Sequence, residues 1–219
     1  MIENYKAALF DLDGTLIDSM WMWHEIDELY LKKFNLEVPD DLASSIEGMG
    51  FSETAVYFKK RFKLNQTIEQ IKSCWNEMAF DIYCNKVPLK NGVIEFLEFL
   101  KEKGIKCAIG TSNSIDLAKA VIKSLGIDKY FDSLVTACMV NASKPKPDIY
   151  LAAARDLNVD NDKCIVFEDI PQGIISGHSA GMTTVAVEDD YSLDLTEKKK
   201  ELADYYIKDY YEFMERYCI

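Results

Sequence analysis

The letters AALFDLDGT at residues 7–15 decide the fold of this 219-residue chain. Four apolar residues run without interruption and then give way to two acidic residues and a glycine. Such a run, ending in a polar turn, is typical of a parallel β-strand buried on both faces. If the backbone stays extended beyond the strand, Asp11 and Asp13 project to the same side. The two carboxylates then repel each other, and a divalent cation or a shared proton is the usual relief.

Similar apolar runs recur along the chain, and helical patterns separate them. Two of the helical patterns end at Gly104 and Gly126, where a glycine is expected just beyond a helix. Strands that alternate with helices of this length predict an α/β fold with a doubly wound parallel sheet. We expect further strands at 107–109, 134–137, 164–167, 184–187 and, at the sheet edge, 205–207, with helices at 92–103, 115–125, 147–157, 173–180 and 210–218.

Residues 17–85 interrupt this rhythm because their patterns are helical throughout. One helix is expected to run to Phe34, with Ser19 or Asp18 as its cap. Two more are expected at 52–62, with Ser52 as its cap, and at 67–82. We therefore predict a Rossmann-like α/β core domain, residues 1–16 and 86–219, with an inserted α-helical cap domain, residues 17–85.

Composition limits the choice of partners. The chain has 25 basic and 37 acidic residues, a formal net charge of −12. This charge repels nucleic acid and anionic membranes, so we expect neither as a partner. It also repels anionic substrates at long range, so any phosphate site must be made locally cationic. The triplet Lys198-Lys199-Lys200 is expected to be a solvated helical segment.

The six cysteines show no C-x-x-C spacing, and several lie in apolar runs. We expect buried thiols in a reducing environment. No charged segment followed by an apolar one opens the sequence, and no apolar run approaches membrane length. These features together predict a soluble, cytoplasmic protein. We expect a monomer, with a dimer as the alternative.

Three further polar segments follow strand-like runs, and parallel strands present their carboxyl ends to one crevice. Thr111, Ser112 and Asn113 offer hydroxyls and backbone amides near a helix N-terminus, which suits a phosphate group. Lys144 can neutralise phosphoryl oxygens. The adjacent carboxylates Glu168-Asp169 are costly at a strand end unless a hard cation binds them.

Four segments in order give the chain a family resemblance. They are DLDGT at 11–15, the strand-end Thr111, SKPKPDIY at 143–150 and FEDIPQGIISGHSAGM at 167–182. Together they resemble the haloacid dehalogenase superfamily, in the group of β-phosphoglucomutases and small sugar-phosphate phosphatases, over essentially the whole chain. The resemblance implies a Mg²⁺-dependent phosphatase. Its expected substrate is a small phosphorylated metabolite, a sugar or polyol phosphate.

The resemblance also implies residue roles. Asp11 would be the nucleophile that forms an aspartyl phosphate, and Asp13 the general acid and base. Thr111 and Lys144 would hold phosphoryl oxygens. Mg²⁺ would bind the Asp11 carboxylate, the backbone carbonyl of Asp13 and the Asp169 carboxylate, with Glu168 as a direct or indirect ligand.

Two positions depart from the mutase pattern. The mutases carry a histidine twelve residues after the nucleophile and an arginine in a cap loop, whereas this chain has Trp23 and Phe51 there. His24 lies one residue late, about 100° around a helix. Phosphatase activity is therefore expected, with a phosphomutase as the alternative. A non-catalytic binding protein and a phosphonate-cleaving enzyme, which needs a cap lysine, remain less favoured.

Overall fold

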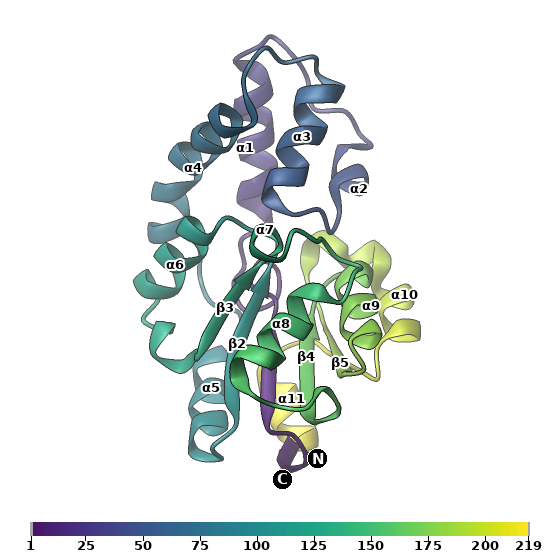
Figure 1. The fold of residues 1–219 in the computed structure, drawn as a ribbon. Helices are drawn as coiled ribbons and strands as arrows, with labels where there is room; N and C mark the ends of the chain where they lie inside the picture. Colours follow the sequence, from purple (N-terminus) through teal and green to yellow (C-terminus); the bar gives the residue numbers. More distant parts are fainter. Residues whose placement is uncertain (1, 219) are drawn as a thin grey trace.

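The computed structural model describes residues 2–218, and within them the core is a six-stranded parallel sheet with strand order β3-β2-β1-β4-β5-β6 (Figure 1). From β1 the chain moves outward to β2 and β3, and then returns to the other side of β1 as β4. Ligands of such sheets bind at this switch in direction. The strands are β1 (Ala7–Phe10), β2 (Lys106–Thr111), β3 (Ser133–Thr136), β4 (Cys164–Glu168), β5 (Thr183–Val187) and β6 (Tyr205–Ile207).

β1 is buried along its whole length, as its apolar run predicted. Its alternate residues belong to two separate apolar clusters. Ala8 and Phe10 pack in one, and Ala7 and Leu9 pack in the other. Because neighbouring side chains of a strand point to opposite faces, the sheet is covered on both sides. The expected doubly wound α/β fold is confirmed.

Helices cover the two faces of this sheet. One face carries α8 and α9, which contact the central strands, and the other carries α5 and α11. Gly104 and Gly126 follow helices with φ of +67° and +68°, as expected for glycines beyond a helix end. The core helices are α5 (Val93–Glu102), α6 (Ile115–Ser124), α7 (Ala137–Val140), α8 (Asp148–Leu157), α9 (Pro171–Ser179), α10 (Thr196–Leu202) and α11 (Tyr210–Tyr217), with short 3-10 turns η1 (Ile2–Asn4), η2 (Asp128–Tyr130), η3 (Asn161–Lys163) and η4 (Asp190–Leu195).

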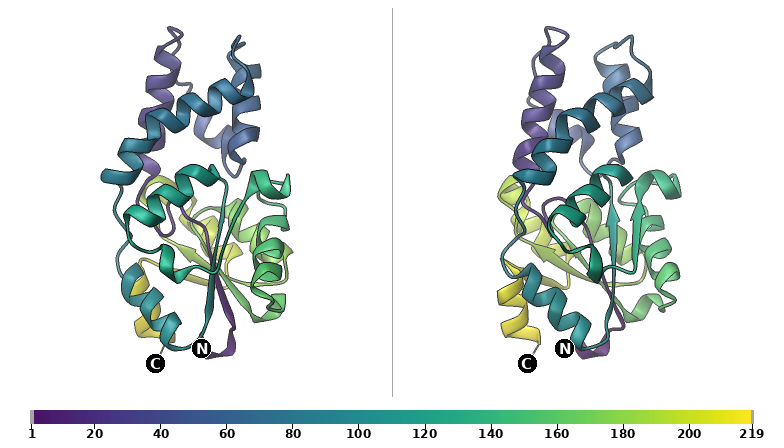
Figure 2. Two further views of the ribbon diagram at one scale, coloured as in Figure 1. Left: turned by 60° about the vertical axis from the view of Figure 1, so that its left-hand side comes forward. Right: turned by 90° about the vertical axis from the view of Figure 1, so that its left-hand side faces the viewer.

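Four further helices stand beyond one end of the sheet (Figures 1 and 2). They are α1 (Met20–Lys32), α2 (Leu42–Ile46), α3 (Phe51–Arg61) and α4 (Ile68–Asn85). Tyr30, Phe58 and Trp75 pack edge to face among them and form an aromatic centre. The expected helical segment thus exists. The division at residues 16/17 and 85/86 stays a prediction.

Helix starts in this segment differ in detail from the expectation. Thr67 caps α4 with a reciprocal bond pair to Gln70. For α3 the predicted cap Ser52 is wrong, because the helix begins one residue earlier and Gly50 is its N-cap. The short helix α2 was not predicted, since five residues carry too little periodicity to be read.

The expected solvation of Lys198-Lys199-Lys200 is wrong at its centre. Lys199 is fully buried, and its Nζ donates to the Val187 carbonyl at 3.3 Å and to Ser192 Oγ at 2.9 Å. A helix turns one residue of any such triplet inward, and here the inward residue finds oxygen acceptors. The neighbouring Lys200 stays exposed and pairs with Glu197.

Within the described residues, all six cysteines are free thiols. Cys107 and Cys164 are buried as expected, whereas Cys138 is exposed. Its place on the four-residue helix α7, at the rim of the sheet, explains the difference. None of the helices in residues 2–218 combines the length and the apolar character that crossing a membrane requires.

Candidate active site

The strands deliver the predicted site residues to one place. Asp11 directly follows β1, Thr111 ends β2, and Glu168 ends β4, so all three lie at carboxyl ends of neighbouring strands. Lys144 reaches the same place from the loop before α8. All four side chains are at least 90% buried. The segments that lie far apart in the sequence therefore converge, as the parallel topology predicts.

Three carboxylates form the floor of this place. One oxygen of each of Asp11, Glu168 and Asp169 lies within 4.8 Å of the others. Burial raises the pKa of Asp11 to about 8, and burial together with Asp11 and Glu168 raises the pKa of Asp169 well above its usual value. Buried like charges at this spacing call for a cation.

Lys144 supplies one positive charge. Its Nζ lies 2.5 Å from Asp11 Oδ1 and also pairs with Glu168 Oε1. Burial alone would lower the pKa of Lys144, but the charges of Asp11 and Glu168 outweigh this effect and hold it above its ordinary value. Tyr150 completes the contact by donating its hydroxyl to Glu168 Oε1 at 2.5 Å. The single positive charge of Lys144 is too little to neutralise the three carboxylates.

The residues present fit a hard divalent cation. Glu168 Oε2 is buried and has no hydrogen-bond partner among residues 2–218. Carboxylate oxygens are the ligands that Mg²⁺ prefers. Two glycines make room for the cluster, since a Cβ at Gly14 would lie 2.3 Å from Asp169 Oδ2 and one at Gly173 would lie 2.0 Å from the Glu168 carboxyl carbon.

The loop that carries Asp169 is fixed from several sides. Thr15 Oγ1 donates to Asp169 Oδ1 at 3.1 Å, and Ser192 Oγ donates to the Asp169 carbonyl at 3.0 Å. Lys199 in turn donates to Ser192. The buried lysine described above therefore supports a candidate metal ligand through one hydroxyl. Sequence reasoning missed it because a lysine triplet carries no sign of which member is turned inward.

Asp13 has different surroundings. Four side chains of the described residues donate hydrogen bonds to its carboxylate. Oδ1 accepts from Ser19 Oγ at 2.6 Å, from Trp23 Nε1 at 3.1 Å and from the Tyr83 hydroxyl, while Oδ2 accepts from Asn113 Nδ2 at 2.9 Å. The carboxylate is thus held from both domains predicted by the sequence, with Trp23 and Tyr83 on cap helices.

These contacts change how three residues are understood. Ser19 makes no cap bond to α1, because its hydroxyl donates to Asp13 instead. Asn113, expected beside the phosphate group, directs its side-chain amide at Asp13 and Tyr83. Tyr83 gave no sign in the sequence, since one tyrosine among the apolar residues of a helix is indistinguishable from core.

Thr111, Ser112 and Asn113, the residues expected to bind the phosphate group, lie at the end of β2 and in the turn before α6. Thr111 Oγ1 accepts from the backbone amide of Asn113 at 3.0 Å, and Ser114 Oγ caps α6 by accepting from the amide of Leu117 at 3.2 Å. Ser112 lines the cavity, and its carbonyl accepts from the amide of Phe51 at 2.8 Å. The segment therefore serves both the cavity and the contact with the cap.

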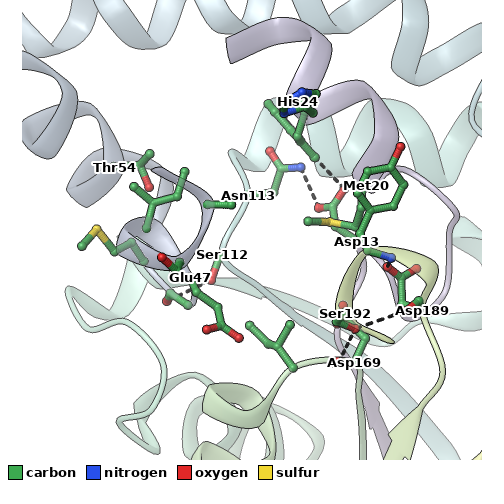
Figure 3. A pocket seen from close by; sticks show the side chains of 18 of the residues that line it. Asp13, Met20, His24, Glu47, Thr54, Ser112, Asn113, Asp169, Asp189 and Ser192 are labelled. Atoms are coloured by element: carbon green, nitrogen blue, oxygen red, sulfur yellow. Dashed lines mark hydrogen bonds between the residues drawn. The ribbon is translucent and has the colours of Figure 1, made fainter. Parts of the chain in front are cut away.

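A cavity of about 730 Å³ opens above these groups, between the sheet and the cap helices (Figure 3). Asp11, Asp13, Thr111, Lys144 and Asp169 line it, together with Ser112 and Asn113, whereas Glu168 lies beneath. Trp23, Phe51 and Trp75 supply an aromatic wall on the cap side. His24 also lines the cavity, with its Nε2 3.4 Å from Glu28 Oε1.

Comparison with known proteins agrees with this arrangement. The family model of haloacid dehalogenase-like hydrolases matches residues 8–187. The phosphorylated carbohydrates phosphatase of Thermotoga maritima is 31% identical over 180 residues, which cover 82% of this chain and 83% of that protein. Hexitol phosphatase A of Escherichia coli is 31% identical over 184 residues, which cover 83% of this chain and 82% of that protein.

A solved structure supports the fold. The crystal structure of CbbY from Rhodobacter sphaeroides in complex with phosphate has a TM-score of 0.85 at 22% identity, covering 95% of this chain and 96% of that one. The family model and the two relatives confirm the resemblance deduced from the motifs. This chain belongs to the haloacid dehalogenase-like hydrolases and is an enzyme of their phosphoric monoester hydrolase kind.

Proposed function

We propose that this enzyme is a Mg²⁺-dependent phosphatase that hydrolyses a small sugar or polyol phosphate through an aspartyl phosphate on Asp11. The observation that carries the proposal is the buried cluster of Asp11, Glu168 and Asp169 with Lys144, at the floor of one cavity. Phosphoryl transfer needs charge neutralisation and in-line positioning above all, and this cluster supplies the charged Lys144 and carboxylates that would hold an ion.

In the proposed first step, a carboxylate oxygen of Asp11 attacks phosphorus and the bond to the substrate oxygen breaks. Asp13 gives its proton to that oxygen, so the alcohol leaves uncharged. In the second step, Asp13 takes a proton from water, the water oxygen attacks phosphorus, and the bond to Asp11 breaks. Free phosphate leaves and both carboxylates return to their starting state.

Lys144 and Thr111 hold the phosphoryl oxygens in this proposal. Mg²⁺ would be held by the carboxylates of Asp11 and Asp169 and by the backbone carbonyl of Asp13, with Glu168 as a direct or indirect ligand. When bound, the ion supplies charge neutralisation for the transferred group. The partnerless Glu168 Oε2 supports an ion at this place.

We propose that residues 17–85 act as a cap that closes over the substrate and excludes bulk water. Contacts between this segment and the core support the idea. The amide of Gly50 donates to Ser143 Oγ at 2.9 Å, and Ser114 Oγ donates to Asn76 Oδ1 at 2.9 Å. A sugar or polyol phosphate is proposed because the two relatives named above act on phosphorylated carbohydrates and hexitol phosphates by name.

The cavity favours hydrolysis over the two enzymatic alternatives. At the mutase histidine and arginine positions, Trp23 and Phe51 contact each other edge to face, with ring centres 6.4 Å apart. Neither side chain can anchor a second phosphate group. For phosphonate cleavage a cap lysine would have to reach the substrate, and no cap lysine is among the described residues that line the cavity.

Release of inorganic phosphate tests the proposal. We expect the purified enzyme to hydrolyse p-nitrophenyl phosphate and glucitol 6-phosphate with Mg²⁺, and to stop when EDTA is added. Asp11→Asn should be inactive but folded, and Asp162→Asn, an exposed aspartate in η3, should match the wild type. Full activity of Asp11→Asn would refute the aspartyl-phosphate route, and isomerised ester without free phosphate would favour the mutase.

A further inference from the structure

The charges around the cavity are unevenly distributed. Away from the acidic cluster, the carboxylates of Asp27, Asp40, Glu47 and Asp194 also line it. Among the described lining residues, Lys144 is the single lysine or arginine. The part of the cavity that receives the substrate's alcohol is therefore acidic.

The positive charge of Lys144 is already paired with carboxylates and does not neutralise this acidic part of the cavity. Its Nζ is enclosed between Asp11 and Glu168, and 2% of its side chain is exposed. A second anionic group on the substrate would meet carboxylates with no further lysine or arginine among the described lining residues, although the charge of Lys198 acts on Glu47 from outside the lining. Like charges brought together in a partly buried site cost several-fold in affinity.

Asp27 is the carboxylate of this set that lies on α1. It follows Met20 and Trp23 on the same side of α1, at the spacing of neighbours on a helix face, and all three line the cavity. Its side chain makes no hydrogen bond or ion pair within residues 2–218. Burial raises its pKa to about 7. An unpaired, partly buried carboxylate is costly for a fold, and a ligand donor would relieve it.

Glu47 adds a second carboxylate at the cavity. It lies in the turn between α2 and α3, and Figure 3 shows its carboxylate extending into the cavity. Oε2 accepts from Gln172 Nε2 at 2.9 Å, which fixes the side chain across the boundary between cap and core. Oε1 is buried and has no partner among the described residues. The orientation of Glu47 is thus set before any substrate binds.

We propose that this cavity selects phosphate esters whose alcohol carries hydroxyl or ammonium groups and no second anionic group, with Asp27 accepting hydrogen bonds from it and Glu47 adding negative charge at the cavity. The inference rests on the proposed phosphatase function and deepens it. The apolar side chains of Met20 and Trp23 lie beside Asp27 and suit the C–H faces of a polyol or a sugar ring. Phosphorylated acids and bisphosphates are excluded.

A matched pair of esters tests this selectivity. Glucitol 6-phosphate and 6-phosphogluconate differ at one carbon, which carries a hydroxyl group in the first and a carboxylate in the second. We expect kcat/KM to be at least about tenfold higher for glucitol 6-phosphate. Glucosamine 6-phosphate, with an ammonium group, should rank with it. Each ester is also measured as a competitor of p-nitrophenyl phosphate hydrolysis, so that a ranking exists even for an ester that is not turned over.

Asp27→Asn tests the assigned residue, and Glu25→Gln is its control on the exposed side of the same helix. In Asp27→Asn the ratio between the glucitol and gluconate esters should fall at least about fivefold, through KM more than kcat. Glu47→Gln should lower the same ratio, and Glu25→Gln should keep it. A general loss of structure would reduce all esters alike and leave the ratio unmoved.

The outcomes separate this inference from the proposed function. If the wild type releases no phosphate from any ester, including p-nitrophenyl phosphate with Mg²⁺, the phosphatase proposal fails and the inference with it. If p-nitrophenyl phosphate is hydrolysed but 6-phosphogluconate is bound or turned over as well as glucitol 6-phosphate, the inference alone is overturned. An unchanged ratio in an Asp27→Asn enzyme that still hydrolyses p-nitrophenyl phosphate like the wild type removes Asp27 from it.

Discussion

The hydroxyl of Tyr83, on the cap helix α4, donates a hydrogen bond to Oδ1 of Asp13, which lies just beyond β1. Seventy residues separate the two along the chain. The same hydroxyl accepts from Asn113 Nδ2 at 2.8 Å, so cap and core share one network around the carboxylate. A carboxylate held in this way keeps one orientation, and its orientation depends on where the cap lies.

Tyr83→Phe should therefore lower activity without unfolding the enzyme. One hydrogen bond to a charged group is lost, worth roughly 1.5–3 kcal/mol, so we expect kcat for glucitol 6-phosphate to fall at least about tenfold. The loss should be smaller for p-nitrophenyl phosphate, whose leaving group needs less help from an acid. Steady-state kinetics with both esters measures this. Tyr211→Phe, an exposed tyrosine on α11, is the control, and an equal loss on both esters would contradict the positioning role.

Mg²⁺ should stabilise the fold, since a ligand that binds the native state shifts unfolding by mass action. At a concentration about a hundred times its dissociation constant, the gain is about 2.7 kcal/mol, or roughly 5–10 °C in Tm for a chain of this size. Asp169→Asn should lose most of this shift, and Asp162→Asn should keep it. Thermal unfolding with and without Mg²⁺ measures this rise in Tm. An undiminished rise in Asp169→Asn would exclude that carboxylate as a ligand.

Two glycines of the same helix allow a sharper test of the site. In α9, a Cβ at Gly173 would lie 2.0 Å from the Glu168 carboxyl carbon, whereas one at Gly177 would lie 2.8 Å from Thr184 Cγ2 in the core. Alanine is normally favoured over glycine in a helix by about 1 kcal/mol. Gly173→Ala should nevertheless displace Glu168 and abolish the Mg²⁺-dependent rise in Tm.

Gly177→Ala is the matched control for that substitution. It should destabilise the core through its own close contacts but retain the Mg²⁺ response, because it touches no acidic side chain. Equal loss of the Mg²⁺ response in both variants would mean that the helix as a whole, rather than Glu168, carries the effect.

The sequence predicts the site residues at the strand ends far better than the residues that reach the site from the cap helices. Asp11, Thr111 and Glu168 each follow or end a buried strand, and parallel strands must bring their carboxyl ends together. Periodicity alone therefore locates them. The partners of Asp13 cannot be found in this way, because Trp23 and Tyr83 reach it from two cap helices whose placement over the sheet no local pattern fixes.

Local signals also failed where tertiary contacts compete with them. Ser19 has the sequence signature of a helix cap, yet its hydroxyl is taken by Asp13. Lys199 resembles its exposed neighbours, yet it is buried against Ser192 and the Val187 carbonyl. In both cases a tertiary contact outside the helix prevails over the local pattern, and for Ser19 the capping preference that is lost is worth about 1 kcal/mol.

Asp27 should make the stability of the enzyme depend on pH. Burial raises its pKa to about 7 in the fold, from an ordinary value of 3.8 in the unfolded chain. As pH rises between these two values, the unfolded chain gives up the proton first, so the folded state loses stability across this range. The loss is complete above pH 7. An asparagine at position 27 does not titrate, so Asp27→Asn should not lose stability in this way.

Asp27→Asn should therefore raise Tm more at pH 8 than at pH 5. The pKa change from 3.8 to about 7 sets an upper bound of about 4 kcal/mol. Because the side chain borders the cavity and its water, we expect about 1–2 kcal/mol, or roughly 2–8 °C. Thermal unfolding of both proteins in EDTA at the two pH values measures the gain, with Glu25→Gln as control. A gain of the same size at both pH values would show that Asp27 is not held in a desolvated place, and its proposed contact with substrate would lose its physical basis.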